Sequence, residues 1–107
     1  MEVIHYQTQD GQDPFNQWLC NLKDRQAQAR ILTRIGRLTA GNMGDCKPLR
    51  DGVSELRIDY ARGYRIYFAR VGSLIIMLLA GGDKDTQQAD IDKAILHLKD
   101  WKKRTSP

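Results

Sequence analysis

The first half of the chain combines one short apolar run with two amphipathic stretches. Residues 3–6 are partly β-branched, which predicts a first strand. Asp13 followed by Pro14 is typical of a helix start, with an N-cap carboxylate and proline at the first helical position. Asp24 provides a second N-cap, and the glycine-containing residues 41–44 end that helix. Each helix has one apolar stripe, formed by Phe15, Trp18, Leu19 and Leu22 in the first and by Ala27, Ile31, Ile35 and Leu38 in the second.

The second half of the chain changes to the period of two that strands show. Residues 53–58 and 64–69 alternate between apolar and polar side chains, and Gly63 marks the turn between them. Residues 74–80 then form a continuous apolar run, which predicts a strand buried on both faces. The C-terminal stretch returns to the helical period, with a stripe formed by Ile91, Ala94, Ile95, Leu98 and Trp101.

These patterns predict the element order β-α-α-β-β-β-α and therefore the α+β class. We expect a small antiparallel-type sheet with the N-terminal helical hairpin packed on one face, and a C-terminal helix. A chain of 107 residues is long enough for one domain and not comfortably for two. Because we find no internal repeat or linker, we predict a single domain over residues 1–107.

Composition changes this picture only in part. The apolar fraction of 41% is enough for a packed core, and the net charge of +4 favours anionic partners such as RNA, DNA or an acidic protein. Cys20 and Cys46 are too few for a disulfide scaffold and lack zinc-binding spacing. We therefore expect both to be reduced, and we predict no metal site.

The N-terminus and the most apolar segment both bear on localisation. Residues 1–10 carry charge and lack the apolar segment of a secretory signal. The apolar run at 74–80 is far too short to span a bilayer. We therefore expect a cytoplasmic protein that has no membrane partner.

Strand alternation sorts the side chains of the predicted hairpin at residues 53–69 onto two faces. The apolar side chains must face the helices, which leaves four others on the opposite face: Glu55, Arg57, Arg65 and Tyr67. Lys47 and Arg50 lie in the loop before the hairpin, and Arg62 lies in its turn. Such a surface suits RNA, because cations contact phosphates and an aromatic ring can stack on a base.

A plainer interpretation of this surface stays open. Exposed sheet faces are commonly charged, so Arg57 and Arg65 can equally be ordinary strand residues. Their partners would then be Glu55 or Asp59.

Three segments carry a resemblance to a known family. They read ELRI at 55–58, GYRIYF at 63–68 and LLAGGDK at 78–84. In this order and spacing the chain resembles the RelE/ParE toxin superfamily, and within it the HigB-like "addiction module killer" branch. The resemblance covers essentially the whole chain, including the hairpin of helices and an Asp-x-x-x-Ala segment at 90–94. It implies a small curved sheet with that hairpin on one face, which agrees with the predicted element order.

The resemblance implies a ribosome-dependent endoribonuclease that a tightly bound antitoxin neutralises. In that superfamily an arginine on the GYR strand and a basic residue after the last strand surround the scissile phosphate, and these match Arg65 and Lys84. Arg57 matches a strand position that is often basic. Lys47 falls where some relatives place a catalytic carboxylate or lysine, so the general base stays unassigned. Whether Tyr67 replaces the C-terminal histidine or tyrosine of other relatives is open.

Cleavage of this kind needs no metal or cofactor from the protein, because the RNA 2′-hydroxyl is the nucleophile. Arginine and lysine stabilise the charge that builds on the phosphoryl oxygens, and the ribosome can hold the codon in the attack geometry. Glu55 and Asp83 are the nearby carboxylates. We interpret each of them either as a general base or as a salt-bridge partner of Arg57 and Lys84.

The sequence leaves three functions open. The first is a messenger RNA endonuclease whose partners are the ribosome, mRNA and an antitoxin of helix-turn-helix type. The second is a ParE-like toxin that inhibits DNA gyrase without catalysis, and the third is a module that only binds a partner. The grouping of Arg57, Arg65, Tyr67 and Lys84 favours the nuclease. A basic stripe of Arg30, Arg34 and Arg37 either contacts ribosomal RNA or, as is commoner, forms a solvated helix face.

Overall fold

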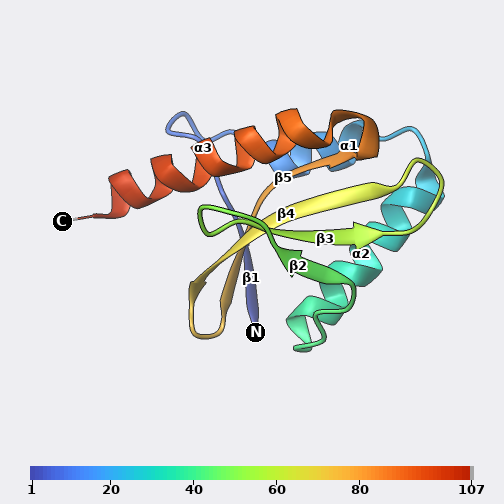
Figure 1. The fold of residues 1–107 in the computed structure, drawn as a ribbon, viewed down its shortest axis with the longest axis horizontal. Coiled ribbons are helices and arrows are strands. Elements are labelled where there is room, and N and C mark those ends of the chain that lie inside the picture. The colour runs from blue at the N-terminus through green and yellow to red at the C-terminus, as the bar shows by residue number, and fades with distance from the viewer. Residues whose placement is uncertain (107) are drawn as a thin grey trace.

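The computed structural model describes residues 1–106, and its elements confirm the α+β class. Strand β1 (Glu2–His5) is followed by helices α1 (Pro14–Asn21) and α2 (Arg25–Thr39). Strands β2 (Cys46–Pro48), β3 (Ser54–Ile58), β4 (Tyr64–Gly72) and β5 (Ile75–Asp83) come next, and a 3-10 turn η1 (Lys84–Thr86) leads into helix α3 (Gln87–Thr105) (Figure 1). Among residues 1–106, no helix combines the length and apolarity needed to cross a membrane.

Helices α1 and α2 begin at the capping residues that the sequence predicted. The Asp13 carboxylate accepts a hydrogen bond from the backbone N–H of Asn16 at 3.0 Å. The Asp24 carboxylate accepts from the backbone N–H groups of Gln26 and Ala27 at 2.9 and 3.1 Å. Each cap satisfies donors that the first helical turn leaves without a partner.

The five strands form one sheet in the order β1-β5-β4-β3-β2. Strand β1 runs parallel to β5, which makes the sheet mixed, whereas the other pairs are antiparallel as expected. The predicted order lacked β2, because residues 46–48 were expected to be loop. They pair with β3 as an edge strand that carries Lys47 opposite Glu55. Three residues ending in proline are too few to show a period of two, and proline is tolerated at a sheet edge.

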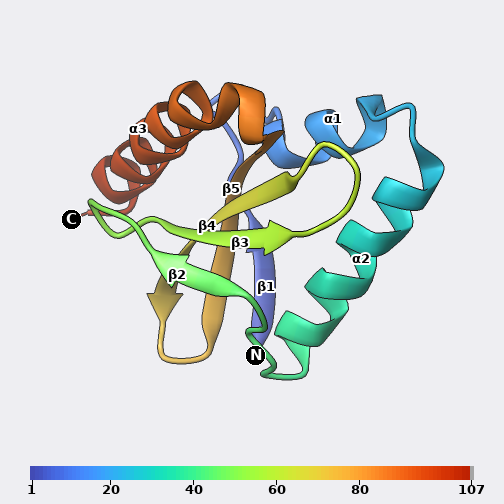
Figure 2. The same ribbon diagram turned by 45° about the vertical axis from the view of Figure 1, so that its right-hand side comes forward.

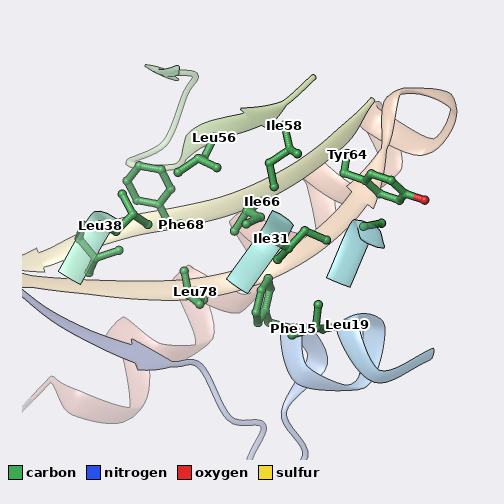
Figure 3. Packing of buried hydrophobic residues seen from close by; sticks show 12 residues of the cluster. Phe15, Leu19, Ile31, Leu38, Leu56, Ile58, Tyr64, Ile66, Phe68 and Leu78 are labelled. Carbon is green, nitrogen blue, oxygen red and sulfur yellow. The ribbon is translucent and has the colours of Figure 1, made fainter. Parts of the chain in front are cut away.

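One face of the sheet packs under α1 and α2 (Figure 3). The apolar face predicted for the β3–β4 hairpin is confirmed, since Leu56, Ile58, Ile66 and Phe68 lie in one buried cluster, together with Ile76 and Leu78 of β5. The helices contribute Phe15, Leu19, Ala27, Ile31 and Leu38 to the same cluster. Burial of each large apolar side chain of this kind contributes roughly 1.5–3 kcal/mol to stability.

Helix α3 covers part of the opposite face, so that α2 and α3 flank the sheet from two sides (Figure 2). A second buried cluster joins Tyr67, Ala69, Met77 and Leu79 of the sheet to Ile91, Ala94, Ile95 and Leu98 of α3. The expectation of an open cationic face is therefore corrected. Glu55 and Tyr67, which that face was to present to solvent, are both 0% exposed. The apolar stripe of α3 needs a sheet face to bury against, and it takes this one.

Strand β5 passes between α1 and α3 at two glycines. A Cβ atom at Gly81 would overlap the Trp18 ring, and one at Gly82 would overlap the Asp90 carboxylate. Any larger residue at either position would push a helix away, so the glycines are required by close approach of the neighbours. Both helices are thereby held tightly against the strand that ends at the 3-10 turn carrying Lys84.

Candidate functional site

The β3–β4 hairpin places two arginines directly opposite one another. Arg57 pairs with Arg65 across the two strands, so both side chains project from the face that α3 partly covers. Two residues of the turn that joins the strands have positive φ, 50° at Ala61 and 72° at Gly63. This conformation turns the chain sharply, which brings the end of β3 and the start of β4 together.

A pocket of about 350 Å³ lies beside this hairpin, and its lining comes from β3, β4, the turn between them, the segment before β2 and η1. The lining residues are Asp45, Arg57, Asp59, Ala61, Gly63, Arg65 and Lys84. The structure thus brings Arg57, Arg65 and Lys84 together around one cavity. We call it the arginine pocket.

Arg65 is the most enclosed cation of the arginine pocket, with a side chain that is 14% exposed. Its Nη1 donates hydrogen bonds to the carbonyl oxygens of Gly63 at 2.9 Å and Tyr64 at 3.2 Å. Its Nε is buried without a hydrogen-bond partner and lies 3.8 Å from Oε1 of Glu55. The turn backbone and the nearby carboxylate therefore both restrain this guanidinium group.

Arg57 is more open, with a side chain that is 38% exposed. Its Nε donates a hydrogen bond to Oε1 of Glu55 at 2.7 Å. This hydrogen bond and the charge of Glu55 raise the pKa of Arg57 above its ordinary value. Within residues 1–106, no hydrogen bond uses the terminal nitrogens of Arg57, so they are available to an anion in the pocket.

Lys84 enters the pocket from η1, directly before α3. It is exposed, and a Cβ atom at Gly63 would lie 3.5 Å from its Cδ and 3.3 Å from Nη1 of Arg65. Gly63 therefore lies against the side chains of both cations.

Glu55 and Tyr67 lie beneath the pocket and do not line it. The Glu55 carboxylate accepts hydrogen bonds from Arg57 and from Nε2 of Gln87, the latter at 2.6 Å. The Tyr67 hydroxyl is buried without a partner, and burial together with the charge of Glu55 raises the pKa of its phenol. Because Tyr67 is fully buried, it presents no ring to a base in this structure.

The remaining predicted residues lie outside the arginine pocket. Lys47 is exposed on β2, and Arg50 pairs with Asp92 of α3 at 2.7 Å. Arg62 pairs with Asp83 at 3.5 Å, and these two residues line a different pocket that also contains Trp18. Asp83 is thus the partner of Arg62, whereas the sequence suggested Lys84.

Sequence reasoning missed three residues of this region. Asp45 and Asp59 are exposed carboxylates at the pocket, and Gln87 reaches Glu55 from the first turn of α3. Asp59 was considered only as an ion-pair partner. The position of Gln87 shortly after the GGDK segment is the one signal that indicated its closeness to the site.

Comparison with known proteins places this chain in a family. The family model described as "Phage derived protein Gp49-like (DUF891)" matches residues 17–100, which is most of the chain. The chain belongs to the Gp49-like family. That family is a type II toxin–antitoxin toxin family of the RelE/HigB kind, so the predicted resemblance is confirmed at this level. Membership of it implies an antitoxin partner.

The Gp49-like match includes every element that lines the arginine pocket. A protein of Haemophilus influenzae (strain Rd), named "Uncharacterized protein", is similar to this chain as well. The two are 49% identical over 82 residues, which cover 77% of this chain and 83% of the relative.

Proposed function

We propose that this Gp49-like protein is a cytoplasmic toxin that cuts messenger RNA on the ribosome and so inhibits translation. The observation that carries the proposal is the convergence of Arg57, Arg65 and Lys84 on one open pocket. Three cations around a cavity suit a phosphodiester group, which accepts several charge-assisted hydrogen bonds. The family supports the toxin part of the proposal, and the pocket chemistry supports the nuclease part.

In the proposed reaction the 2′-hydroxyl oxygen of the message attacks the adjacent phosphorus. The bond from O2′ to phosphorus forms as the bond from phosphorus to O5′ breaks, which leaves a 2′,3′-cyclic phosphate and a 5′-hydroxyl. Arg65 and Arg57 stabilise the charge on the phosphoryl oxygens, and Lys84 stabilises the leaving oxygen. The ribosome supplies the alignment of nucleophile and leaving group.

The 2′-hydroxyl proton needs an acceptor, and the leaving oxygen needs a proton. Glu55 is fully buried and Asp83 faces the other pocket. The carboxylates that line the arginine pocket are those of Asp45 and Asp59, both exposed. We therefore assign the proton acceptor to this pair of aspartates, acting directly or through one water molecule. The leaving O5′ oxygen takes its proton from the ammonium group of Lys84, and exchange with solvent restores both groups.

The partners in this proposal are the ribosome with its message and an antitoxin of helix-turn-helix type. The antitoxin is expected to cover the arginine pocket or to block ribosome binding by bulk. An interface of standard size, on the order of 1,600 Å², fits the long-lived inhibition that a toxin requires.

The decisive experiment is primer extension on a translated message with the purified protein, with and without ribosomes. Arg65→Ala should lower the cleavage rate about a hundred- to a thousand-fold, which is the usual cost of removing one donor to developing charge. Arg65→Lys should recover part of this rate, because lysine keeps the charge but lacks the planar two-pronged grip of arginine. Arg70→Ala is the matched control, since Arg70 is exposed on the same strand outside the pocket.

Three outcomes would contradict the proposal or its site. A folded Arg65→Ala protein that cuts at the wild-type rate would show that the arginine pocket is not the catalytic site. A wild-type protein that cuts nothing on ribosomes but inhibits DNA supercoiling by gyrase would make this a ParE-like inhibitor, and one that does neither would leave only partner binding.

A further inference from the structure

We propose that Glu55 is a positioning residue, whose buried carboxylate holds the guanidinium groups of Arg57 and Arg65 at the pocket and links them to α3 through Gln87. The inference rests on the proposed function and deepens it. It assigns Glu55 a role that differs from that of a general base.

The first observation is the arrangement of like charges. Arg57 and Arg65 are directly opposite on neighbouring antiparallel strands, where two positive charges repel and destabilise the pairing. Glu55 lies two residues before Arg57 on the same face, with Oε1 2.7 Å from Nε of Arg57 and 3.8 Å from Nε of Arg65. Oε1 of Glu55 therefore lies near both guanidinium groups, and its negative charge offsets the repulsion between Arg57 and Arg65.

The second observation is that this carboxylate is enclosed. Glu55 is 0% exposed, and an isolated buried carboxylate would be strongly destabilising unless paired and hydrogen-bonded. Arg57 satisfies Oε1, and Nε2 of Gln87 donates to Oε2 at 2.6 Å. Groups from three elements therefore meet at one side chain: β3, β4 and the first turn of α3.

The same enclosure argues against proton transfer by Glu55. A general base must come within about 2.6–3.2 Å of the proton that it removes, or reach it through one water. Glu55 lies below the arginines and does not line the pocket. A substrate would reach it only by displacing Arg57, which the proposed reaction needs in place.

The test compares Glu55→Gln, which keeps the shape and removes the charge, with Gln87→Leu, which removes the second donor. Glu2→Gln is the matched control, because Glu2 is the other glutamate of the chain and is exposed on β1. For Glu55→Gln we expect kcat to fall about a hundred-fold, the cost typical of a small misplacement of reacting groups. KM should stay unchanged or fall, because a negative charge near the phosphate is removed. Gln87→Leu should lower kcat by a smaller factor, because Arg57 still holds Oε1 of Glu55, and Glu2→Gln should match wild type.

Two further measurements separate positioning from base catalysis and from general loss of structure. The pH–rate curve of Glu55→Gln should keep the wild-type shape at reduced height, and loss of a rising acid limb would instead identify Glu55 as the base. The Nε–H resonances of Arg57 and Arg65 in NMR spectra should shift in Glu55→Gln while the backbone resonances of the core stay in place.

Each remaining result also decides the question. If Glu55→Gln fails to fold, the test is made with Gln87→Leu. A Gln87→Leu protein with the wild-type kcat and an unshifted Arg57 Nε–H signal would then overturn the inference. Wild-type kcat in a folded Glu55→Gln protein would do the same. If wild type cuts nothing on ribosomes, the proposed function fails, and the Nε–H signals alone decide whether Glu55 holds the two arginines.

Discussion

At the scale of single residues, Gly63 combines a backbone requirement with a place in the arginine pocket. Its φ is 72°, and an added Cβ would lie 3.3 Å from Nη1 of Arg65. We expect Gly63→Ala to lower the free energy of unfolding by roughly 1–2 kcal/mol through left-handed strain. Under the proposed function it should also lower the rate of message cleavage. Urea denaturation and primer extension measure the two effects.

Gly11→Ala is the control for this prediction. Gly11 has a φ of 84° and no atom within 4 Å of an added Cβ, so alanine there would have the backbone strain without the close neighbour. It should lower stability by a similar amount and keep full cleavage activity. An equal decrease in activity in both variants would show that strain alone, and no interaction with Arg65, explains the effect at Gly63.

The sequence predicted part of the pocket at this scale. Strand alternation placed Arg57 and Arg65 on one face, and the family motif added Lys84. Alternation says which face a side chain occupies but not what covers that face, so the burial of Glu55 and Tyr67 under α3 was missed. Gln87 was missed because its hydrogen bond to Glu55 spans elements far apart in sequence.

At the scale of elements, α2 carries four arginines and no acidic residue. Within residues 1–106, none of these arginines forms an ion pair with a carboxylate. Arg34 donates to the carbonyl oxygen of Arg57 at 2.7 Å, and Arg30 lies 4.3 Å from the ring centre of Tyr60. A second pocket along α2 shares Asp59 with the arginine pocket, so the basic helix continues the proposed RNA surface.

Under the proposed function, the double variant Arg30→Gln/Arg37→Gln should raise KM for programmed ribosomes on the order of tenfold with little change in kcat. The slope of log affinity against log salt should fall by about one for each phosphate that the variant no longer binds. Lys102→Gln/Lys103→Gln removes the same charge from the exposed end of α3 and serves as the control. An equal rise in KM for both double variants would mean that only net charge matters.

The glycine pair in β5 supports a second prediction at this scale. Gly81→Ala would force its Cβ against Trp18, and overpacking of this kind typically costs about 1–3 kcal/mol. Adding Trp18→Leu should relieve the overlap, so the double variant should be destabilised by less than the sum of the two single variants. Thermal or urea unfolding of all four proteins gives the coupling, and strict additivity would contradict the close approach.

The long periodic elements were predictable, whereas two features of the sheet were not. Helices α1 and α2 followed from their periods and caps, α3, β3 and β4 followed from their periods, and β5 followed from its continuous apolar run. Strand β2 was too short to show a period, and its pairing depends on β3. The parallel pairing of β1 with β5 was not predicted either, because a hydrophobic pattern carries no information on strand direction.

At the scale of the whole molecule, Tyr6 and α3 join the two ends of the chain. The Tyr6 hydroxyl donates to Asp100 at 2.6 Å, and the His97 ring stacks on Tyr6 with 4.6 Å between centres. Burial lowers the pKa of His97, although the negative charge of Asp100 acts in the opposite direction and raises it. The folded protein therefore takes up a proton at His97 less readily than the unfolded chain, whose histidine titrates near pH 6.5, about its usual value.

The stability that depends on neutral His97 is complete above the unfolded pKa and is lost as pH falls toward the folded pKa. We expect the free energy of unfolding to decrease between about pH 7.5 and about pH 5, and to decrease less in His97→Gln. Urea unfolding at both pH values measures this. Lys99→Gln, on the exposed side of the same helix, should keep the wild-type decrease, and an unchanged decrease in His97→Gln would contradict the assignment.

The order of the elements along the chain, with β1 paired to the much later β5, sets when the arginine pocket can be completed during synthesis. Glu2 is synthesised well before its partner Ile75, which is made only after β4, and Lys84 and Gln87 follow later still. Contacts so distant in sequence form late, because the intervening chain must first be available. A nascent or truncated chain that ends before η1 lacks Lys84 and so has no complete arginine pocket, and under the proposed function it should cut no message.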